Sequence, residues 1–379
     1  MGGDRIDRAR LKRANARLSD AAVDPAIWPE IMEEISAAAG ATGAVLLQSD
    51  VRTSDVPRTS GLDDFLRKNY FAEGWHQRDV RADRGVPLLL RGQTAIIDQD
   101  LVTPEEMKSL GLYAELMIPK GLGWFSAIGF WSGPSLWGLS IQRAWRDGPY
   151  EQEDKRIFGR LSRRLSEAAT LSQAVGRVAL AGMTNALELV HQPALALDRR
   201  GFVLDFNPGA ARLFDNEMRL CNHRLVVRDK QASAALAGLV DRMRLTPDTS
   251  TLPCASIVVQ RSGRRPVIVR VLPVDGAART PFLGARTLLV LTDLEAEPVP
   301  ESALMARAFG LSPAESRIAT LVAGGLSPRQ AADELGIVYE TARAHLKAVF
   351  DKTGAHRQSE LVALLLRLSQ KTRPRRGGS

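Results

Sequence analysis

The segment 311–368 constrains the fold more strongly than any other part of this 379-residue chain. It contains two similar stretches, Ser-Pro-Ala-Glu at 312–315 and Ser-Pro-Arg-Gln at 327–330. In each, the serine can cap a helix, the proline suits the first helical position, and the Glu or Gln side chain can reach back to the cap. Each stretch therefore predicts the first turn of a helix.

Glycines and apolar spacing extend this prediction. Gly324 and Gly325 end the first expected helix, Gly336 ends the second, and a third helix is expected over 339–352. Two helices joined by a short glycine turn are typical of a helix-turn-helix motif.

The expected third helix has two different faces. One is apolar and should meet a core; it consists of Ala342, Leu346, Val349 and Phe350. The other carries Arg343 and Lys347 one turn apart, with Ala344 between them. Long cationic donors suit guanine and phosphate acceptors, and a small apolar side chain suits a thymine methyl. This pattern predicts a helix in the DNA major groove. The alternative is an ordinary exposed helix, which the acidic Glu340 and Asp351 would suit.

Residues 311–368 resemble the LuxR-type DNA-binding domain. The matching stretches are 311–315, 325–327, 331–337, 341–347 and 352–354. The resemblance implies that Arg343, Ala344 and Lys347 face the groove and that Thr341 meets the DNA backbone. Tyr339 stands where the family usually has a small polar residue, which bears on the half-site sequence. The candidate DNA-binding residues are Tyr339, Glu340, Thr341, Arg343, Ala344 and Lys347.

Leucines after the third helix offer a further apolar edge, formed by Leu361, Leu364, Leu365 and Leu368. In the LuxR family this fourth helix is a dimer contact. Alternatively, the leucines close the core of the small domain itself.

The charge of the chain is uneven. The net charge is +8, and residues 301–379 hold twelve Lys and Arg against seven Asp and Glu. Such an excess favours a C-terminal unit that faces a polyanion. A solvated surface with a basic tail over 371–379 would give the same count.

The first part of the chain predicts an antiparallel sheet flanked by helices. After a basic segment at 1–24, a domain is expected over 25–150, with a helix at 25–39. Apolar runs typical of buried strands lie at 44–47, 86–90, 95–97, 124–131 and 136–141, and helical patterns lie at 62–71 and 104–110. Ser132 to Ser135 should form the turn of a hairpin.

Helical spacing continues from this domain into a connecting or dimerisation helix over 151–192. Gly176 and Gly182 weaken its middle. It is therefore either one connector shared by two chains or two helices joined between these glycines, and its front half can pack on the first sheet.

Residues 193–293 predict a second sheet domain, followed by a linker at 294–303 and the DNA-binding domain at 304–370. The stretches 196–201 and 206–214 resemble the first hairpin and helix of a PAS domain. That family binds flavin, haem or small metabolites, or nothing. A flavin-binding PAS domain carries its reactive cysteine in an Asn-Cys-Arg sequence, whereas Cys221 is followed by Asn222 and His223. A lone histidine is a weak candidate for a haem ligand. We therefore expect no cofactor.

The 25–150 domain resembles a GAF-type or autoinducer-binding sheet. Leu66-x3-Tyr70-x4-Trp75-x3-Asp79 follows the spacing of the Trp-x3-Tyr-x4-Tyr-x3-Asp-Pro signature of acyl-homoserine-lactone receptors. The resemblance implies that Tyr70, Trp75 and Asp79 surround a ligand. Leu66 lacks the indole N–H that binds the lactone carbonyl, and Val80 replaces the proline. We therefore expect a ligand other than a standard acyl-homoserine lactone.

Four further aromatic residues are candidates for the same cavity: Trp124, Phe130, Trp131 and Trp137. Pockets with apolar walls and a few polar groups are the usual ligand sites. The alternative is that these aromatic side chains are plain core.

Together, these patterns predict a multidomain α+β protein: GAF-like and PAS-like sensor domains joined by a long helix, and a four-helix DNA-binding domain. The expected function is transcription regulation by a homodimer that binds double-stranded DNA under the control of a small-molecule effector. RNA polymerase is a further candidate partner. In the alternative, the GAF-like and PAS-like domains bind a partner protein and not a metabolite.

Other functions find no support in the sequence. The common phosphate-loop, hydrolase and zinc-protease motifs are absent, so we expect no enzyme and no catalytic residues. Two cysteines and five histidines make a structural zinc site improbable. No apolar run approaches the roughly 18 residues of a membrane span, and we expect a cytoplasmic protein.

Overall fold

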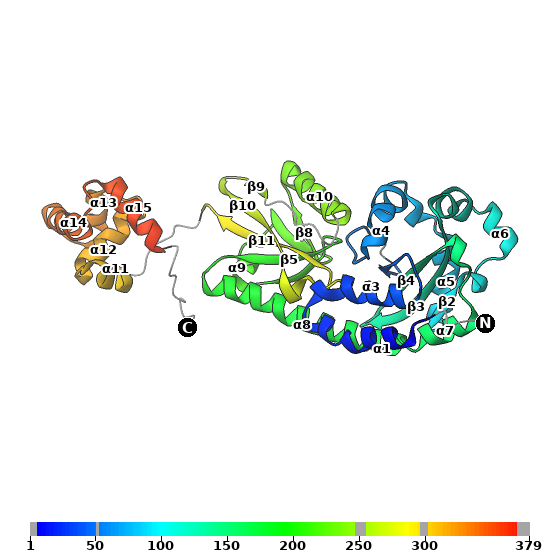
Figure 1. The fold of residues 1–379 in the computed structure, drawn as a ribbon. Helices are drawn as coiled ribbons and strands as arrows, with labels where there is room; N and C mark the ends of the chain where they lie inside the picture. Colours follow the sequence, from blue (N-terminus) through cyan, green and yellow to red (C-terminus); the bar gives the residue numbers. More distant parts are fainter. Residues whose placement is uncertain (1–5, 51–52, 247–254, 296–301, 370–379) are drawn as a thin grey trace.

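The computed structural model describes residues 6–50, 53–246, 255–295 and 302–369. They form two units built on antiparallel sheets and a C-terminal helical unit, which confirms the expected mixed α+β class (Figure 1). The basic tail at 371–379 and residues 296–301 of the expected linker lie outside the described residues.

The first unit is centred on a four-stranded antiparallel sheet with the order β1-β4-β3-β2. Its strands are β1 (Gly43–Gln48), β2 (Ala95–Ile97), β3 (Leu122–Ser132) and β4 (Ser135–Ala144). Ser132 pairs with Ser135 across the expected hairpin turn, where Gly133 has a φ of 55° that favours glycine.

The helical elements of this unit cover both faces of the sheet. In chain order they are α1 (Arg8–Arg17), α2 (Asp20–Val23), η1 (Pro25–Ile27), α3 (Trp28–Ala38), α4 (Ser60–Phe65), η2 (Leu66–Phe71), η3 (Trp75–Gln77), α5 (Val80–Leu90), η4 (Asp98–Asp100), α6 (Pro104–Ser109), η5 (Leu112–Met117), η6 (Ile118–Lys120), η7 (Trp145–Asp147) and α7 (Gln152–Gly159).

Two expectations for this unit were wrong. The run 86–90 is not a strand but the end of α5, because Asp79 caps that helix and Arg81, Gly85 and Leu89 turn inward at four-residue spacing. The segment 1–24 is also more than a basic extension. Leu11 of α1 and its neighbours are buried in the same core as α3.

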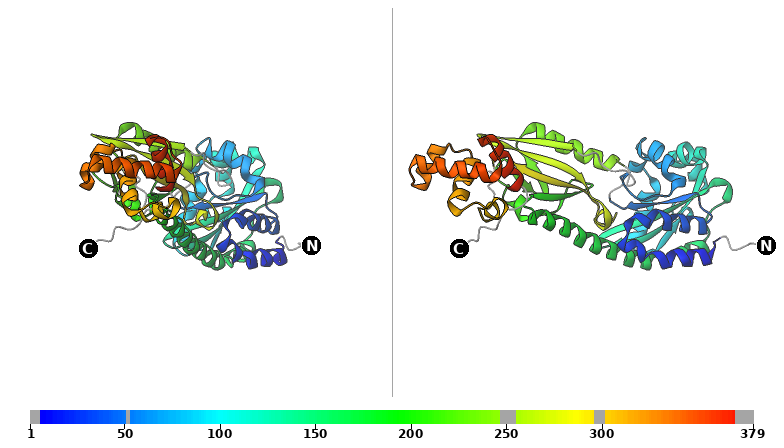
Figure 2. Two further views of the ribbon diagram at one scale, coloured as in Figure 1. Left: turned by 90° about the vertical axis from the view of Figure 1, so that its left-hand side faces the viewer. Right: turned by 60° about the vertical axis from the view of Figure 1, so that its left-hand side comes forward.

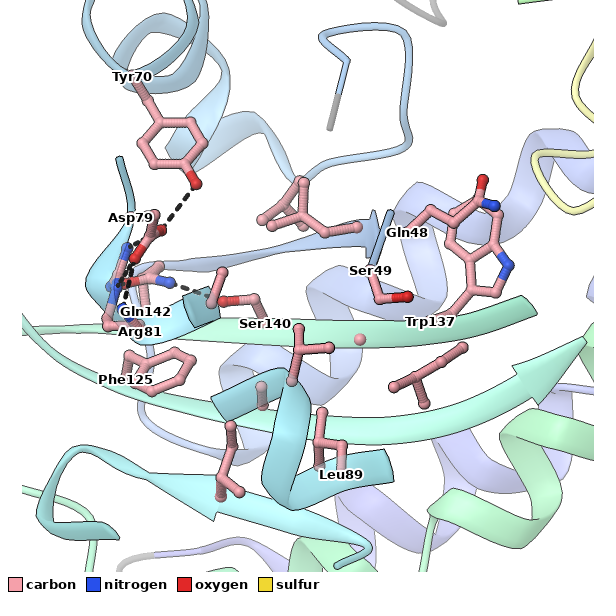
Figure 3. A pocket seen from close by; sticks show the side chains of 18 of the residues that line it. Gln48, Ser49, Tyr70, Asp79, Arg81, Leu89, Phe125, Trp137, Ser140 and Gln142 are labelled. Carbon is pink, nitrogen blue, oxygen red and sulfur yellow. Dashed lines mark hydrogen bonds and ion pairs between the residues drawn. The ribbon is translucent and has the colours of Figure 1, made fainter. Parts of the chain in front are cut away.

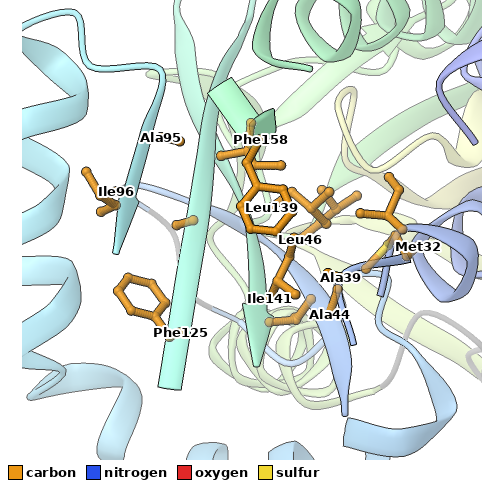
Figure 4. Close-up of a cluster of buried hydrophobic side chains, with 14 of the residues drawn as sticks. Met32, Ala39, Ala44, Leu46, Ala95, Ile96, Phe125, Leu139, Ile141 and Phe158 are labelled. Atoms are coloured by element: carbon orange, nitrogen blue, oxygen red, sulfur yellow. The ribbon is translucent and has the colours of Figure 1, made fainter. Parts of the chain in front are cut away.

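The side chains of β1 alternate between the two faces of the sheet, as its two-residue period requires. Ala44 and Leu46 face a closed core that they share with Met32 of α3 (Figure 4). Val45 and Leu47 point the other way and line a pocket. The sheet therefore separates a closed core from a cavity.

Helix α8 (Ser162–Leu189) runs along both sheet units (Figures 1 and 2). The break in the expected 151–192 helix lies between α7 and α8, not between Gly176 and Gly182. At Gly176 a side chain would not fit, because an added Cβ would lie 2.6 Å from Thr280 Cγ2 and 2.9 Å from the Ala277 carbonyl oxygen. Gly176 thus lets the second unit approach the helix.

The second unit contains a five-stranded antiparallel sheet with the order β6-β5-β11-β10-β9 and a separate hairpin of β7 and β8. Its strands are β5 (Ala194–Asp198), β6 (Val203–Phe206), β7 (Met218–Cys221), β8 (Arg224–Val227), β9 (Ala255–Arg261), β10 (Arg264–Pro273) and β11 (Ala285–Asp293). Its helices are α9 (Pro208–Ala211), α10 (Lys230–Leu245) and η8 (Gly276–Arg279).

Two buried contacts join the second unit to the first. Phe282 packs within the first core, with its ring 5.2 Å from Trp28. Arg199 Nε lies 3.2 Å from an Asp55 carboxylate oxygen, and both side chains are nearly inaccessible to solvent.

The C-terminal unit consists of α11 (Ser302–Phe309), α12 (Pro313–Ala323), α13 (Pro328–Leu335), α14 (Tyr339–Thr353) and α15 (Gln358–Ser369). Both expected capping boxes form: the N–H groups of Ser312 and Ser327 donate to Glu315 and Gln330 at 2.7 and 2.9 Å. Gly336 has a φ of 65° and ends α13, as expected.

Candidate DNA interface and sensor pocket

Helix α14 is fixed by a small apolar core. Its Ala342, Leu346 and Val349 are buried against residues of α12 and α13. Leu361 and Leu365 of α15 are also fully buried there, so these two leucines close the core of the unit itself. The Leu368 side chain lies outside the described residues. This packing sets which side of α14 faces outward.

All six residues predicted to contact DNA are exposed on α14; they are Tyr339, Glu340, Thr341, Arg343, Ala344 and Lys347. Arg343 makes only a loose pair with Glu340, with 3.8 Å between Nη1 and Oε2. Such exposed pairs contribute little stability, so the guanidinium is available to another acceptor.

Two residues that the sequence did not single out lie beside this face. Val338, directly before α14, is 71% exposed. Arg329 of α13 lies over the Tyr339 ring, at 5.7 Å from its centroid. The sequence did not point to Arg329, because it lies inside the capping box, where Ser327 and Gln330 predict only a helix start.

The end of α14 is tied to the start of α12. Lys352 Nζ lies 2.7 Å from a Glu315 carboxylate oxygen and donates to the Gly310 carbonyl at 3.1 Å. This hydrogen bond from Lys352, together with the Ser312 N–H, lowers the pKa of Glu315. One carboxylate, that of Glu315, therefore holds both the capping box of α12 and the end of α14.

The pocket of the first unit lies between the sheet and helices α4, η2 and α5 and has a volume of about 80 Å³ (Figure 3). That is room for several water molecules or a small organic group. Its walls are mostly apolar. The polar residues that line it are Gln48, Ser49, Tyr70, Asp79, Arg81, Ser140 and Gln142.

A hydrogen-bonded chain occupies one end of this pocket (Figure 3). Tyr70 Oη donates to Asp79 Oδ2 at 2.7 Å, and the Arg81 N–H donates to Oδ1 at 2.9 Å. The guanidinium of Arg81 also lies 3.3 Å from each carboxylate oxygen. Arg81 Nη1 donates to Gln142 Oε1 at 3.0 Å, and Gln142 Nε2 donates to Ser140 Oγ at 2.8 Å.

This chain keeps Asp79 charged. Burial alone would raise the pKa of Asp79, but the Arg81 guanidinium and the Tyr70 hydroxyl outweigh burial and lower it. The carboxylate therefore forms a buried salt bridge. Its pairing with Arg81 avoids the high cost of an unpaired buried charge.

The structure brings together only part of the predicted ligand site. Tyr70, Asp79 and Trp137 line the pocket, but Trp75, Trp124, Phe130 and Trp131 are not among its lining residues. Trp75 packs under Arg78, Trp124 stacks on Trp145 at 4.6 Å, and Trp131 is 42% exposed. Arg81 was expected only as a neighbour that could pair with Asp79, and it also lines the pocket. Phe125 and Gln142, which line the pocket too, were not predicted from the sequence.

A second buried carboxylate, Asp98, lies near this network. Tyr113 Oη and the Phe125 N–H donate to its two oxygens, each at 2.6 Å. Burial nevertheless raises the pKa of Asp98 from its ordinary 3.8 to about 6. Within the described residues, no group of three or more His, Cys, Asp or Glu is placed to hold a metal ion.

We expect Asp98 to make the first unit less stable as pH rises. Because the folded pKa is raised, the unfolded chain releases this proton first, and stability falls between about pH 4 and pH 6, by on the order of 2–3 kcal/mol. Asp98→Asn should lack this component. Urea unfolding at pH 4 and pH 7, followed by tryptophan fluorescence, measures it. Equal pH dependence in both proteins would contradict the assignment.

Residues 310–365 match the protein family described as "Bacterial regulatory proteins, luxR family". This segment is a LuxR-family DNA-binding domain. The match contains both capping boxes, the turn at Gly336 and the whole of α14. It confirms the resemblance for the C-terminal unit. A search of curated proteins found no match to the chain.

The solved structures that resemble this chain have low sequence identity to it. A phage VqmA–DPO complex is 14% identical, with 52% of this chain and 92% of that chain covered and a TM-score of 0.22. A Vibrio cholerae VqmA–ligand–DNA complex is 17% identical (49% and 88% covered, TM-score 0.22). The E. coli DhaR(N)–DhaL complex is 12% identical (78% and 91% covered, TM-score 0.23). These scores are too low to transfer a ligand or partner.

Among the described helices, none is both long and apolar enough to cross a bilayer.

Proposed function

We propose that this protein is a homodimeric transcription regulator that binds DNA through α14 and is controlled by a small molecule in the pocket of the first unit. The observation that carries the proposal is the outward face of α14. It presents Arg343 and Lys347 on a packed LuxR-family domain.

The two cations suit different parts of DNA. Arg343 and Lys347 lie one turn apart on the exposed side of α14, with Ala344 beside them. A guanidinium can donate two parallel hydrogen bonds to guanine, whereas an ammonium acts as a point charge toward phosphate. We therefore assign base recognition to Arg343 and backbone anchoring to Lys347.

Arg343→Ala should weaken binding to the specific site by about 1–3 kcal/mol and relax its sequence preference. Lys347→Ala should lower affinity for all sequences and reduce the salt slope by roughly one unit. Both variants should stay folded, because neither side chain is buried. Fluorescence anisotropy at several salt concentrations measures both effects.

Arg146→Ala provides the control, since it removes one cation from the first unit, where the side chain is 89% exposed. It should leave DNA affinity unchanged. Full affinity in both α14 variants would remove the basis for the proposed interface.

The pocket supports the ligand part of the proposal. It joins apolar walls to a polar chain at one end, which is the usual composition of a small-molecule site. Both oxygens of Asp79 are already engaged by Arg81 and Tyr70. A lactone amide would have to displace one of these donors, and Leu66 cannot supply the indole contact.

We therefore expect acyl-homoserine lactones to leave the melting temperature of the full chain unchanged. A true ligand at one hundred times its dissociation constant should add about 2.7 kcal/mol of stability. Thermal-shift screening against lactones and unrelated aromatic acids tests this. Ala127→Leu, which adds volume to the lining, should abolish any genuine shift. Strong stabilisation by a lactone would overturn the ligand inference.

The homodimer follows from the way such domains read DNA. Two-fold helix-turn-helix dimers bind half-sites about one DNA turn apart, which gives a near-palindromic operator. The chain needs a self-complementary surface for this, and α8 carries exposed apolar side chains.

A further inference from the structure

Helix α8 carries a continuous stripe of side chains along one line of its surface. The stripe consists of Leu171, Val175, Val178, Gly182, Asn185 and Leu189. The spacing between successive members alternates between four and three residues, which is the spacing of a coiled-coil seam. Its large members are accessible: Leu171 is 50% exposed, Val178 75% and Leu189 82%.

Gly182 has no role within the described part of the chain. Glycine in a helix interior is destabilising relative to alanine. Gly176, six residues earlier, is required by packing, because an added Cβ there would press against Thr280 and the Ala277 carbonyl. At Gly182, by contrast, nothing lies within 4 Å of where a Cβ would be. A second helix approaching the stripe would give this glycine a function, since small residues let backbones come close.

The polar member of the stripe selects an orientation. In a parallel in-register pair, each residue meets its own counterpart, so Asn185 meets Asn185 of the other copy and the two amides can hydrogen-bond. In an antiparallel pair centred on the stripe, Asn185 would meet Val175, and its amide would lose its partner. A single asparagine in an apolar seam is known to fix register and oligomeric state.

We propose that a second copy of this chain docks on this α8 seam, parallel and in register. The inference deepens the homodimer of the proposed function by naming the surface and its direction. The parallel arrangement brings the carboxyl ends of both α8 helices, and hence the start of both second units, to the same end of the pair.

Disulfide trapping in the full chain tests the seam. The background is a Cys221→Ser, Cys254→Ser chain, in which Leu171→Cys or Ala174→Cys is then introduced. A disulfide needs Cα atoms within about 7 Å, which a parallel seam provides at position 171 but not at position 174, off the seam. Under mild oxidation, most of the Leu171→Cys protein should become a cross-linked dimer, whereas the Ala174→Cys protein should stay uncross-linked.

The competing arrangements give different results. An antiparallel pair would cross-link Leu171→Cys chains only with Leu189→Cys chains in a mixed sample, and this outcome overturns the orientation. A dimer by light scattering that gives no cross-link at position 171 overturns the seam but leaves the homodimer standing. A monomer at micromolar concentration overturns both.

Discussion

Asp79→Ala is expected to lower the free energy of unfolding of the first unit by about 3–5 kcal/mol, because it leaves a buried cation without its partner. The Asp79 and Arg81 side chains are each 6% exposed. The guanidinium of Arg81 would retain its hydrogen bond to Gln142 but lose its ion pair with Asp79. Urea unfolding followed by tryptophan fluorescence measures the loss.

A double variant separates the charge effect from simple loss of packing. Asp79→Ala combined with Arg81→Leu removes both charges, and replacing a whole buried pair by apolar groups is often neutral. The double variant should therefore regain most of the stability that the single variant loses. If the single variant lost less than about 1 kcal/mol, as exposed pairs do, the buried salt bridge would not hold this end of the pocket.

Val178→Glu is expected to produce a monomer and to reduce affinity for a two-half-site operator by about 10²–10⁴-fold. That is the usual gain from linking two binding units. The substitution places two carboxylates opposite each other in the proposed α8 seam, where they repel. Light scattering and anisotropy on the same samples measure assembly and DNA binding together.

Arg177→Glu is the matched control for this prediction, because the same acidic side chain then lies next to the seam and not in it. It should remain a dimer with near-normal operator affinity. A Val178→Glu chain that stays dimeric would show that the chains meet elsewhere.

The C-terminal unit was predictable because its signals are local. Each capping box involves residues three apart, and each of these helices ends at glycine. The same kind of signal was present but missed in the second unit. Asn222 and His223 both have positive φ, forming the two-residue turn between β7 and β8.

The pocket was less predictable because it depends on which face of a strand each side chain meets. In β3, Phe125 and Ala127 line the pocket, whereas Trp124, one residue away, stacks on Trp145 outside it. The number of aromatic residues in the strand does not indicate which of them face the pocket and which face away. The prediction of a strand at 86–90 was wrong for a related reason. The apolar residues around Pro87 suggested a strand, but they continue a helix that Asp79 caps at its start.

The proposed function requires that α14 reads DNA sequence. The most direct measurement is selection of binding sites from a random double-stranded DNA pool by the purified full chain, with Arg343→Ala in parallel. We predict a near-palindromic consensus with two half-sites about one turn apart, and for Arg343→Ala a loss of preference at one position in each half-site. No enriched sequence, or the same consensus with both proteins, would contradict the account.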